Sequence, residues 1–134
     1  MSRRVFSPGF RLSLTDALVL LAGAIGSILA AQVERWMGLT VGFVVGHFFL
    51  FCNVFRLARP LELAWSALFV SLAGSTVVTE WPGWRMTLGI SLVATLLVVV
   101  AQLRKPSYHG IAWRRFNPGL LEWWDAQGSA DENR

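Results

Sequence analysis

The sequence is poor in the residues that usually carry out chemistry. It has one cysteine, Cys52, and two histidines, His47 and His109. A single cysteine cannot form an internal disulfide, and no pair of these residues has the spacing of zinc ligands. We therefore predict no metal site and no catalytic residue, and we interpret Cys52 as a small buried apolar side chain.

Charged residues are absent from long stretches of the chain. Of the eight aspartates and glutamates, Asp16, Glu34, Glu62 and Glu80 lie at the ends of the four longest apolar segments and none lies inside one, so a proton-coupled transporter would lack its usual carboxylate. What remains is apolar, because 54% of the 134 residues are hydrophobic and the mean hydropathy is +0.52. Each segment is long enough to cross about 30 Å of hydrocarbon as a helix. The predicted spans are residues 15–34, 37–57, 62–80 and 85–103.

These segments predict an all-α fold, a polytopic membrane protein with four transmembrane helices in an up-down bundle. We expect residues 1–104 to form the transmembrane domain, with Thr15 or Asp16 capping its first helix. Residues 105–134 are expected to form a basic and aromatic cytoplasmic tail at the membrane interface. A short helix can start there at Asn117 and Pro118, and the polar end should fray after Asp125.

The basic residues are distributed unequally between the two sides of the predicted membrane. Only Arg35 and Arg85 fall on one side, and the other ten of the twelve fall on the opposite side. This bias predicts that both termini are cytoplasmic. We expect a membrane of the bacterial inner type, which suits so compact a protein. The bias also accounts for the basic pI near 10.6 without nucleic acid as a partner. The ten residues are Arg3, Arg4, Arg11, Arg56, Arg59, Arg104, Lys105, Arg114, Arg115 and Arg134.

Aromatic and basic side chains mark the expected boundaries with the lipid headgroups. Indole rings suit this region because they bury a flat apolar surface while their N–H group stays near water, and arginines reach the phosphates. The predicted interface residues are Trp36, Trp81, Trp84, Arg56, Arg59, Trp113, Arg114, Arg115, Trp123 and Trp124.

Small residues recur every four positions in the first two spans. This spacing lets two helix backbones approach closely, and van der Waals contact then replaces the hydrophobic drive that lipid removes. The partner of this surface stays open, since it could be the other span, a second copy or another protein. The expected packing positions are Ala22, Gly26 and Ala30 in the first span and Gly38, Gly42, Gly46 and Asn53 in the second.

Hydroxyl residues form a second pattern, in the third and fourth spans. In an antiparallel pair the two strips can face one another and bond across the helices or back to their own carbonyls. The first interpretation is that they hold the helices together, and the alternative is a polar path for a solute. The strips are Ser71, Ser75 and Thr79, and Thr87, Ser91 and Thr95.

His47 is the one ionisable residue near the middle of a span, which makes it a candidate cofactor-binding residue. A neutral imidazole can ligate the metal of a haem or pigment, or hydrogen-bond a quinone. The other interpretation is a neutral histidine hydrogen-bonded inside the helix bundle. No second histidine lies in the spans, so one copy cannot supply both ligands of a bis-histidine haem.

The sequence thus favours a small integral membrane protein without enzymatic activity. It would act as a subunit or as an accessory or assembly factor, through helix packing in the lipid bilayer, as a homo-oligomer or with other membrane subunits. An oligomeric channel or carrier and a haem, pigment or quinone site at His47 are the alternatives. The sequence requires no cofactor.

Overall fold

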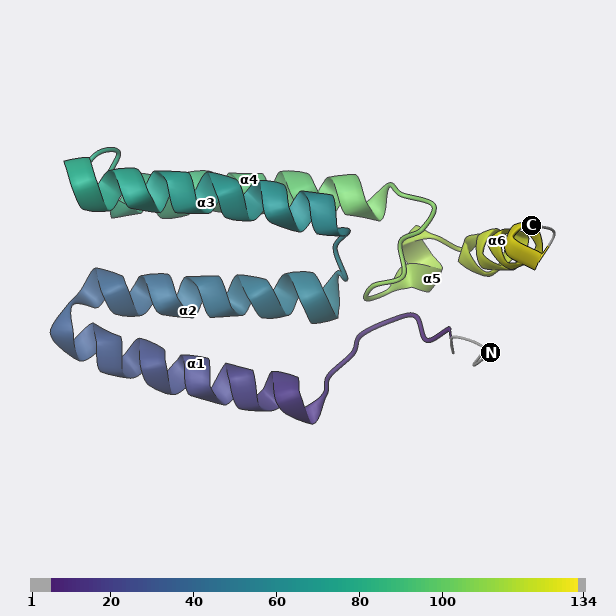
Figure 1. Cartoon of the computed structure of the whole chain (residues 1–134), viewed down its shortest axis with the longest axis horizontal. Coiled ribbons are helices and arrows are strands. Elements are labelled where there is room, and N and C mark those ends of the chain that lie inside the picture. Colours follow the sequence, from purple (N-terminus) through teal and green to yellow (C-terminus); the bar gives the residue numbers. More distant parts are fainter. Residues whose placement is uncertain (1–5, 133–134) are drawn as a thin grey trace.

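The computed structural model describes residues 6–132, which are 77% helical and include no strand. The predicted Arg3, Arg4 and Arg134 lie outside these residues. A π-helix, η1, continues directly from α2 (Figure 1). The elements are α1 (Leu14–Val33), α2 (Arg35–Phe49), η1 (Leu50–Val54), α3 (Arg59–Thr79), α4 (Trp84–Leu103), α5 (Trp113–Phe116) and α6 (Leu120–Glu132).

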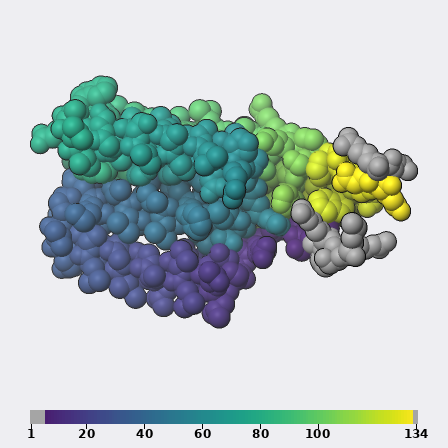
Figure 2. Space-filling view, viewed as in Figure 1, coloured from purple at the N-terminus to yellow at the C-terminus, as the bar shows by residue number. Residues whose placement is uncertain are grey.

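Four of these helices are long and apolar enough to cross a membrane: α1, α2 together with η1, α3 and α4. This confirms the all-helical class and the four apolar helices, and the predicted spans agree with the observed bounds to within three residues. The helices are arranged as two hairpins, α1 with α2 and α3 with α4, which lie side by side (Figures 1 and 2). The tail helices α5 and α6 lie beyond one end of the hairpins, near the start of the chain (Figure 1).

The four long helices leave most of their apolar side chains exposed. Leu14, Val33 and Val78 are each about 80% exposed, and the most apolar part of α1 has no buried residue. A soluble monomer rarely shows so large an apolar surface, because water solvates it poorly. Hydrocarbon does not impose that cost, so the surface is that of a membrane-embedded protein.

Local signals set the helix ends, with one correction to the sequence prediction. The N-cap of α1 is Ser13, whose hydroxyl accepts from the Asp16 N–H while the Asp16 carboxylate accepts from the Ser13 N–H. The pair forms a capping box, so Asp16 contributes from the third helical position and Thr15 is not the cap. Glu34 alone separates α1 from α2, and its side chain caps α2 at Met37 N.

The end of the second span is a π-helix rather than an α-helix. Phe55 N donates to Leu50 O at 2.9 Å, five residues back, and Leu57 N donates to Phe51 O. The wider turn shifts the helical register, so residues after Leu50 do not continue the faces of α2. It brings Asn53 and Phe51 inside the structure, where both are buried.

The tail packs onto this end of the bundle. Ile111 N donates to Val54 O and Gly9 N donates to His109 O, both at 2.7 Å. The Asn117 amide donates to the carbonyls of Pro106 and Tyr108, so it ties the tail together instead of capping a helix. Where the sequence predicted fraying after Asp125, α6 continues as a helix to Glu132.

Candidate functional site

The buried centre of the molecule is an aromatic cluster around His47. The His47 ring lies 4.9 Å from the Trp65 ring at an angle of 13°, and 4.1 Å from the Phe43 ring. The Phe51 and His47 rings meet edge to face, and the Phe69 ring stacks on Trp65 with 5.4 Å between their centroids. These rings come from α2, η1 and α3, so they join the two hairpins.

His47 makes its hydrogen bond within its own helix. Nδ1 lies 2.7 Å from Phe43 O, and a carbonyl can only accept, so Nδ1 carries the proton. Nε2 is then the nitrogen left for a ligand. The rings of Phe43 and Trp65 pack directly against the imidazole.

Trp65 is the residue of this site that the sequence analysis missed. Its indole Nε1 donates to Ser91 O at 3.0 Å and to Thr95 Oγ1 at 2.9 Å, so it connects the aromatic cluster to α4. The available signal was its position inside a span, because tryptophans in membrane proteins concentrate at the interfaces. A tryptophan away from the interface needs a buried partner for its N–H group.

The two predicted hydroxyl strips do not face one another. Thr87, Ser91 and Thr95 are buried along α4. They meet a different face of α3, since Thr87 Oγ1 lies 2.7 Å from Thr76 Oγ1. Thr76 was not in the predicted strip.

The α3 strip lies on an outward-facing part of its helix. Ser71 Oγ donates to Ala67 O, and Thr79 Oγ1 donates to Ser75 O, both at 2.8 Å. Ser75 Oγ donates to Trp81 O in the following turn. Among the described residues of one copy, only the α4 strip therefore lies in the interior, and the α3 strip does not line a polar path with it.

Gly38 and Gly42 of α2 pack against α1, and the α1 strip that they contact lies one residue along from the predicted strip. A Cβ added at Gly38 would contact Ala31 and lie 2.7 Å from Ser27 O. One added at Gly42 would lie 2.9 Å from Ser27 Oγ, and one at Gly23 would lie 2.5 Å from Val45. The contacting strip on α1 is thus Gly23, Ser27 and Ala31, and Ser27 Oγ also donates to Gly38 O at 2.6 Å.

The other predicted packing positions remain open. A Cβ at Gly26 or at Gly46 would meet nothing within 4 Å, Ala22 is exposed and Ala30 is partly exposed. Beside Gly46, α1 and α2 form a groove with a volume of about 360 Å³, which Gly26 does not line. Its lining is small or aliphatic: Leu20, Gly23, Ala24, Ser27, Ile28, Gly42, Val45 and Gly46.

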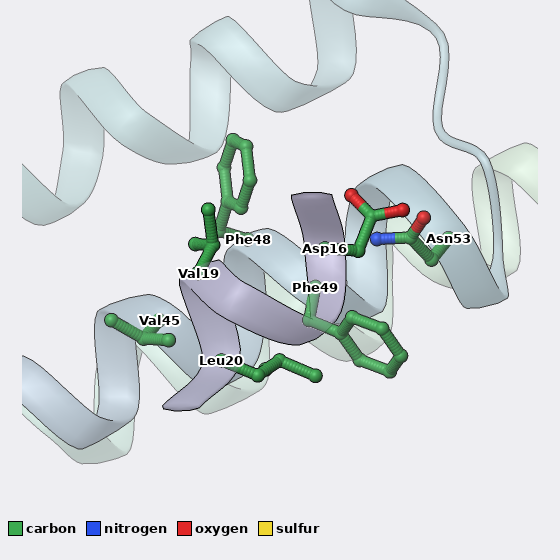
Figure 3. A pocket seen from close by; sticks show the side chains of 7 residues that line it. All are labelled: Asp16, Val19, Leu20, Val45, Phe48, Phe49 and Asn53. Carbon is green, nitrogen blue, oxygen red and sulfur yellow. The ribbon is translucent and has the colours of Figure 1, made fainter. Parts of the chain in front are cut away.

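Asn53 has a polar role at the start of α1. With its nitrogen turned toward the two acceptors, the Asn53 amide donates to Asp16 Oδ2 at 3.1 Å and to Arg11 O at 3.0 Å. This orientation is the one that satisfies the hydrogen-bond network. Figure 3 shows Asp16 and Asn53 next to one another beside the apolar residues Val19, Leu20 and Phe49. The pair joins the first and second spans at the end opposite Glu34.

The predicted interface residues occupy the two ends of the hairpins. Trp36 and Trp84 lie in the first turns of α2 and α4, and Trp81 lies in the turn after α3. The basic and aromatic residues at the other end are Arg56, Arg59, Trp113, Arg114, Arg115, Trp123 and Trp124. Among these, the Arg114 guanidinium lies 5.5 Å from the Trp113 ring, and Trp124 stacks on Phe6.

No group of three or more histidine, cysteine, aspartate or glutamate residues within 6–132 is placed to hold a metal ion.

Comparisons of the chain with protein-family models, curated proteins and solved structures found no match.

Proposed function

We propose that this chain is a small integral membrane protein of a bacterial inner membrane that acts through helix packing. It is a subunit or an accessory or assembly factor rather than an enzyme, and both of its termini face the cytoplasm. Its partners are the lipid bilayer and either further copies of itself or other membrane subunits, and nucleic acid is not among them.

The observation that carries this proposal is the open groove between α1 and α2. Gly46 lines this groove, and a Cβ added there would meet nothing within 4 Å beyond its own helix backbone; the same is true of Gly26, which lies outside the groove lining. Gly23, Gly38 and Gly42, by contrast, already hold α1 and α2 together. One set of small residues thus builds the hairpin, and the other is available to a helix from outside.

The polar interior supports a packing role as well. The buried hydroxyls of α4 bond to α3 or to carbonyls of α4 itself. The indole N–H of Trp65, on α3, donates to Thr95 of α4. Such bonds contribute about 0.6 kcal/mol each in membranes and hold helices in register. We infer that they stabilise the α3–α4 hairpin and do not act on a substrate.

Association in mild detergent tests the packing role. Because a Cβ added at Gly46 meets nothing within 4 Å in one copy, Gly46→Leu should leave the fold intact and shift the complex toward the free chain in light scattering or native mass spectrometry. Gly74→Leu is the matched control, since Gly74 on α3 is equally open. A stable monomer without associated protein, whose mass Gly46→Leu does not change, contradicts the proposal.

Labelling with a membrane-impermeant thiol reagent tests the orientation. In a Cys52→Ser background, Ser129→Cys reports on the tail and Trp81→Cys reports on the turn between α3 and α4, and both positions are exposed. In intact spheroplasts only the Trp81→Cys variant should react, and after lysis both should. Reaction of Ser129→Cys before lysis contradicts a cytoplasmic tail.

A further inference from the structure

A pocket of about 350 Å³ opens at the end of the bundle where the second span finishes and α3 begins. Known ligand sites start at about 300 Å³, so this one has the size for a small polar group. Five separate parts of the chain meet there: η1, the link before α3, the first turn of α3, the end of α4 and the tail. The side chains in its lining that carry polar or ionisable groups are Cys52, Arg56, Glu62, Gln102, Ser107 and His109.

Arg56 supplies a positive charge that the surrounding chain does not favour. Burial and the nearby cation of Arg11 both lower the pKa of the Arg56 guanidinium. The guanidinium donates through Nη1 to Ser7 O at 2.7 Å, which is a neutral acceptor. An anion bound beside Arg56 would therefore offset the cost of burial and the repulsion from Arg11, because a nearby negative charge favours the charged guanidinium.

The backbone at Arg56 is held in a conformation that costs energy. Its φ is +48°, in the left-handed region that disfavours a residue with a Cβ. The buried Gln102 amide holds this link in place, because its oxygen accepts from Ala58 N at 3.2 Å and its nitrogen donates to Arg56 O at 3.4 Å. Such strain concentrates at binding sites, where the surrounding structure fixes a side chain in position.

Glu62 supplies a negative charge in the same pocket. It lies in the first turn of α3, and its carboxylate accepts a weak bond from Cys52 Sγ at 3.7 Å. Arg56 directs its bond to Ser7 and not to Glu62. The pocket thus presents the cation of Arg56 and the anion of Glu62, and the aromatic ring of Phe51 also lines it.

We propose that this pocket binds the phosphoethanolamine headgroup of a membrane phospholipid, with the phosphate at Arg56 and the ammonium at Glu62. The proposal rests on the membrane placement given above, which puts the pocket at the level of the cytoplasmic headgroups. A headgroup that is only anionic would meet the Glu62 carboxylate without a compensating cation. Choline carries no N–H group to donate to that carboxylate, so ethanolamine fits the pair better.

Native mass spectrometry of the full chain, with phosphatidylethanolamine, phosphatidylglycerol and phosphatidylcholine as probes, tests the proposal. Phosphatidylethanolamine should bind about tenfold or more tightly than the other two, which corresponds to one charge-assisted hydrogen bond. Glu62→Gln should remove this preference, and Arg56→Gln should weaken all three lipids. Arg59→Gln and Glu80→Gln are the controls, since neither residue lines the pocket, and the preference should persist in both.

Three outcomes overturn the assignment. Equal binding of the three lipids does so, as does a preference that survives Glu62→Gln. Equally tight binding of water-soluble glycerophosphoethanolamine shows that a free solute, and not a lipid, is the ligand. Glu62→Gln keeps the volume of the side chain, and unchanged thermal unfolding in detergent verifies that it folds.

Failure of this proposal can be distinguished from failure of the proposed function. Carbonate extraction of membranes reports whether the chain is embedded, and the mass of the detergent complex reports its association. An embedded, associated protein without lipid preference overturns only the headgroup site. A protein released by carbonate removes the membrane placement, and the headgroup site falls with it.

Discussion

His47 and Trp65 stack almost parallel in the centre of the bundle, with 4.9 Å between their ring centroids and 13° between their planes. They belong to different hairpins, so this contact joins α2 to α3. The Nδ1–H of His47 is bonded to Phe43 O, which fixes the orientation of the imidazole ring. We predict from this arrangement that His47 is a structural residue whose ring provides packing area.

The first prediction separates packing from ligation at His47. His47→Phe keeps a flat ring against Trp65 and should lower the free energy of unfolding by less than about 1.5 kcal/mol. His47→Ala leaves a cavity and should cost about 2 kcal/mol or more. Unfolding in detergent, followed by tryptophan fluorescence, measures both values.

The visible absorption spectrum of the native preparation completes this test. We expect no band that depends on His47. A pigment or haem band that is lost equally in His47→Phe and His47→Ala would instead make His47 a ligand, because phenylalanine preserves the packing but cannot bind a metal.

The second prediction concerns the two kinds of glycine in the α1–α2 hairpin. Gly38→Ala places a methyl group against Ala31 and Ser27 O, so it should destabilise the monomer by about 1–3 kcal/mol. Gly26→Ala meets nothing and should leave stability unchanged or raise it by up to about 1 kcal/mol, through helix propensity. Thermal unfolding of both variants in detergent gives the comparison. Similar losses for the two would show that the hairpin does not depend on close contact at Gly38.

The third prediction addresses the hydroxyl pair Thr76 and Thr87, whose Oγ1 atoms lie 2.7 Å apart. Thr76→Val and Thr87→Val should each cost about 0.5–1.5 kcal/mol, because each leaves the other hydroxyl without this partner. The double variant should cost less than the sum of the two, since no unpaired partner remains. A double-mutant cycle of unfolding free energies measures this coupling, and strictly additive losses would contradict it.

Flux measurements on variants of the hydroxyl strips test the channel alternative. Ion and solute flux into liposomes should be absent for the native chain, and Ser71→Ala on the outward strip should have no effect. Flux that the native chain supports, and that Ser91→Ala or Thr95→Val alters, would restore the polar path.

The fourth prediction uses Tyr108, the single tyrosine of the chain. It is fully buried, its hydroxyl donates to Ile111 O at 2.7 Å, and burial raises its pKa above the usual value of 10.0. The neutral form is therefore favoured in the folded tail. Its contribution to stability is complete below the unfolded pKa and is lost as pH rises through the higher folded pKa.

An alkaline titration followed by tyrosinate absorbance should give a midpoint above that of the denatured chain. The tail contacts should loosen over the same pH range. Tyr108→Phe removes the absorbance change, so it controls for signals from the seven tryptophans. A midpoint equal to that of the denatured chain would contradict the burial.

The four long helices were determined by local properties of the sequence. Their lengths follow from uninterrupted apolar segments, and their ends follow from charged or turn-forming residues such as Glu34 and Gly83. These signals depend on neighbouring residues along the chain, so the span bounds were predicted to within three residues. The Ser13 cap was the exception, because Ser13, Thr15 and Asp16 all have side chains that can cap a helix.

Only the tertiary structure decided which faces of the helices meet. Positions every four residues define several parallel strips on each helix, and the sequence does not say which one is in contact. On α1 the contact strip is Gly23, Ser27 and Ala31, one residue from the predicted strip. On α3 Trp65 stacks on His47 and Phe69 stacks on Trp65, and with these large rings packed toward α2, Thr76 meets α4 and Ser71 stays outside. Helix rotation is set by the packing of large side chains between distant segments, which is the information that a single sequence lacks.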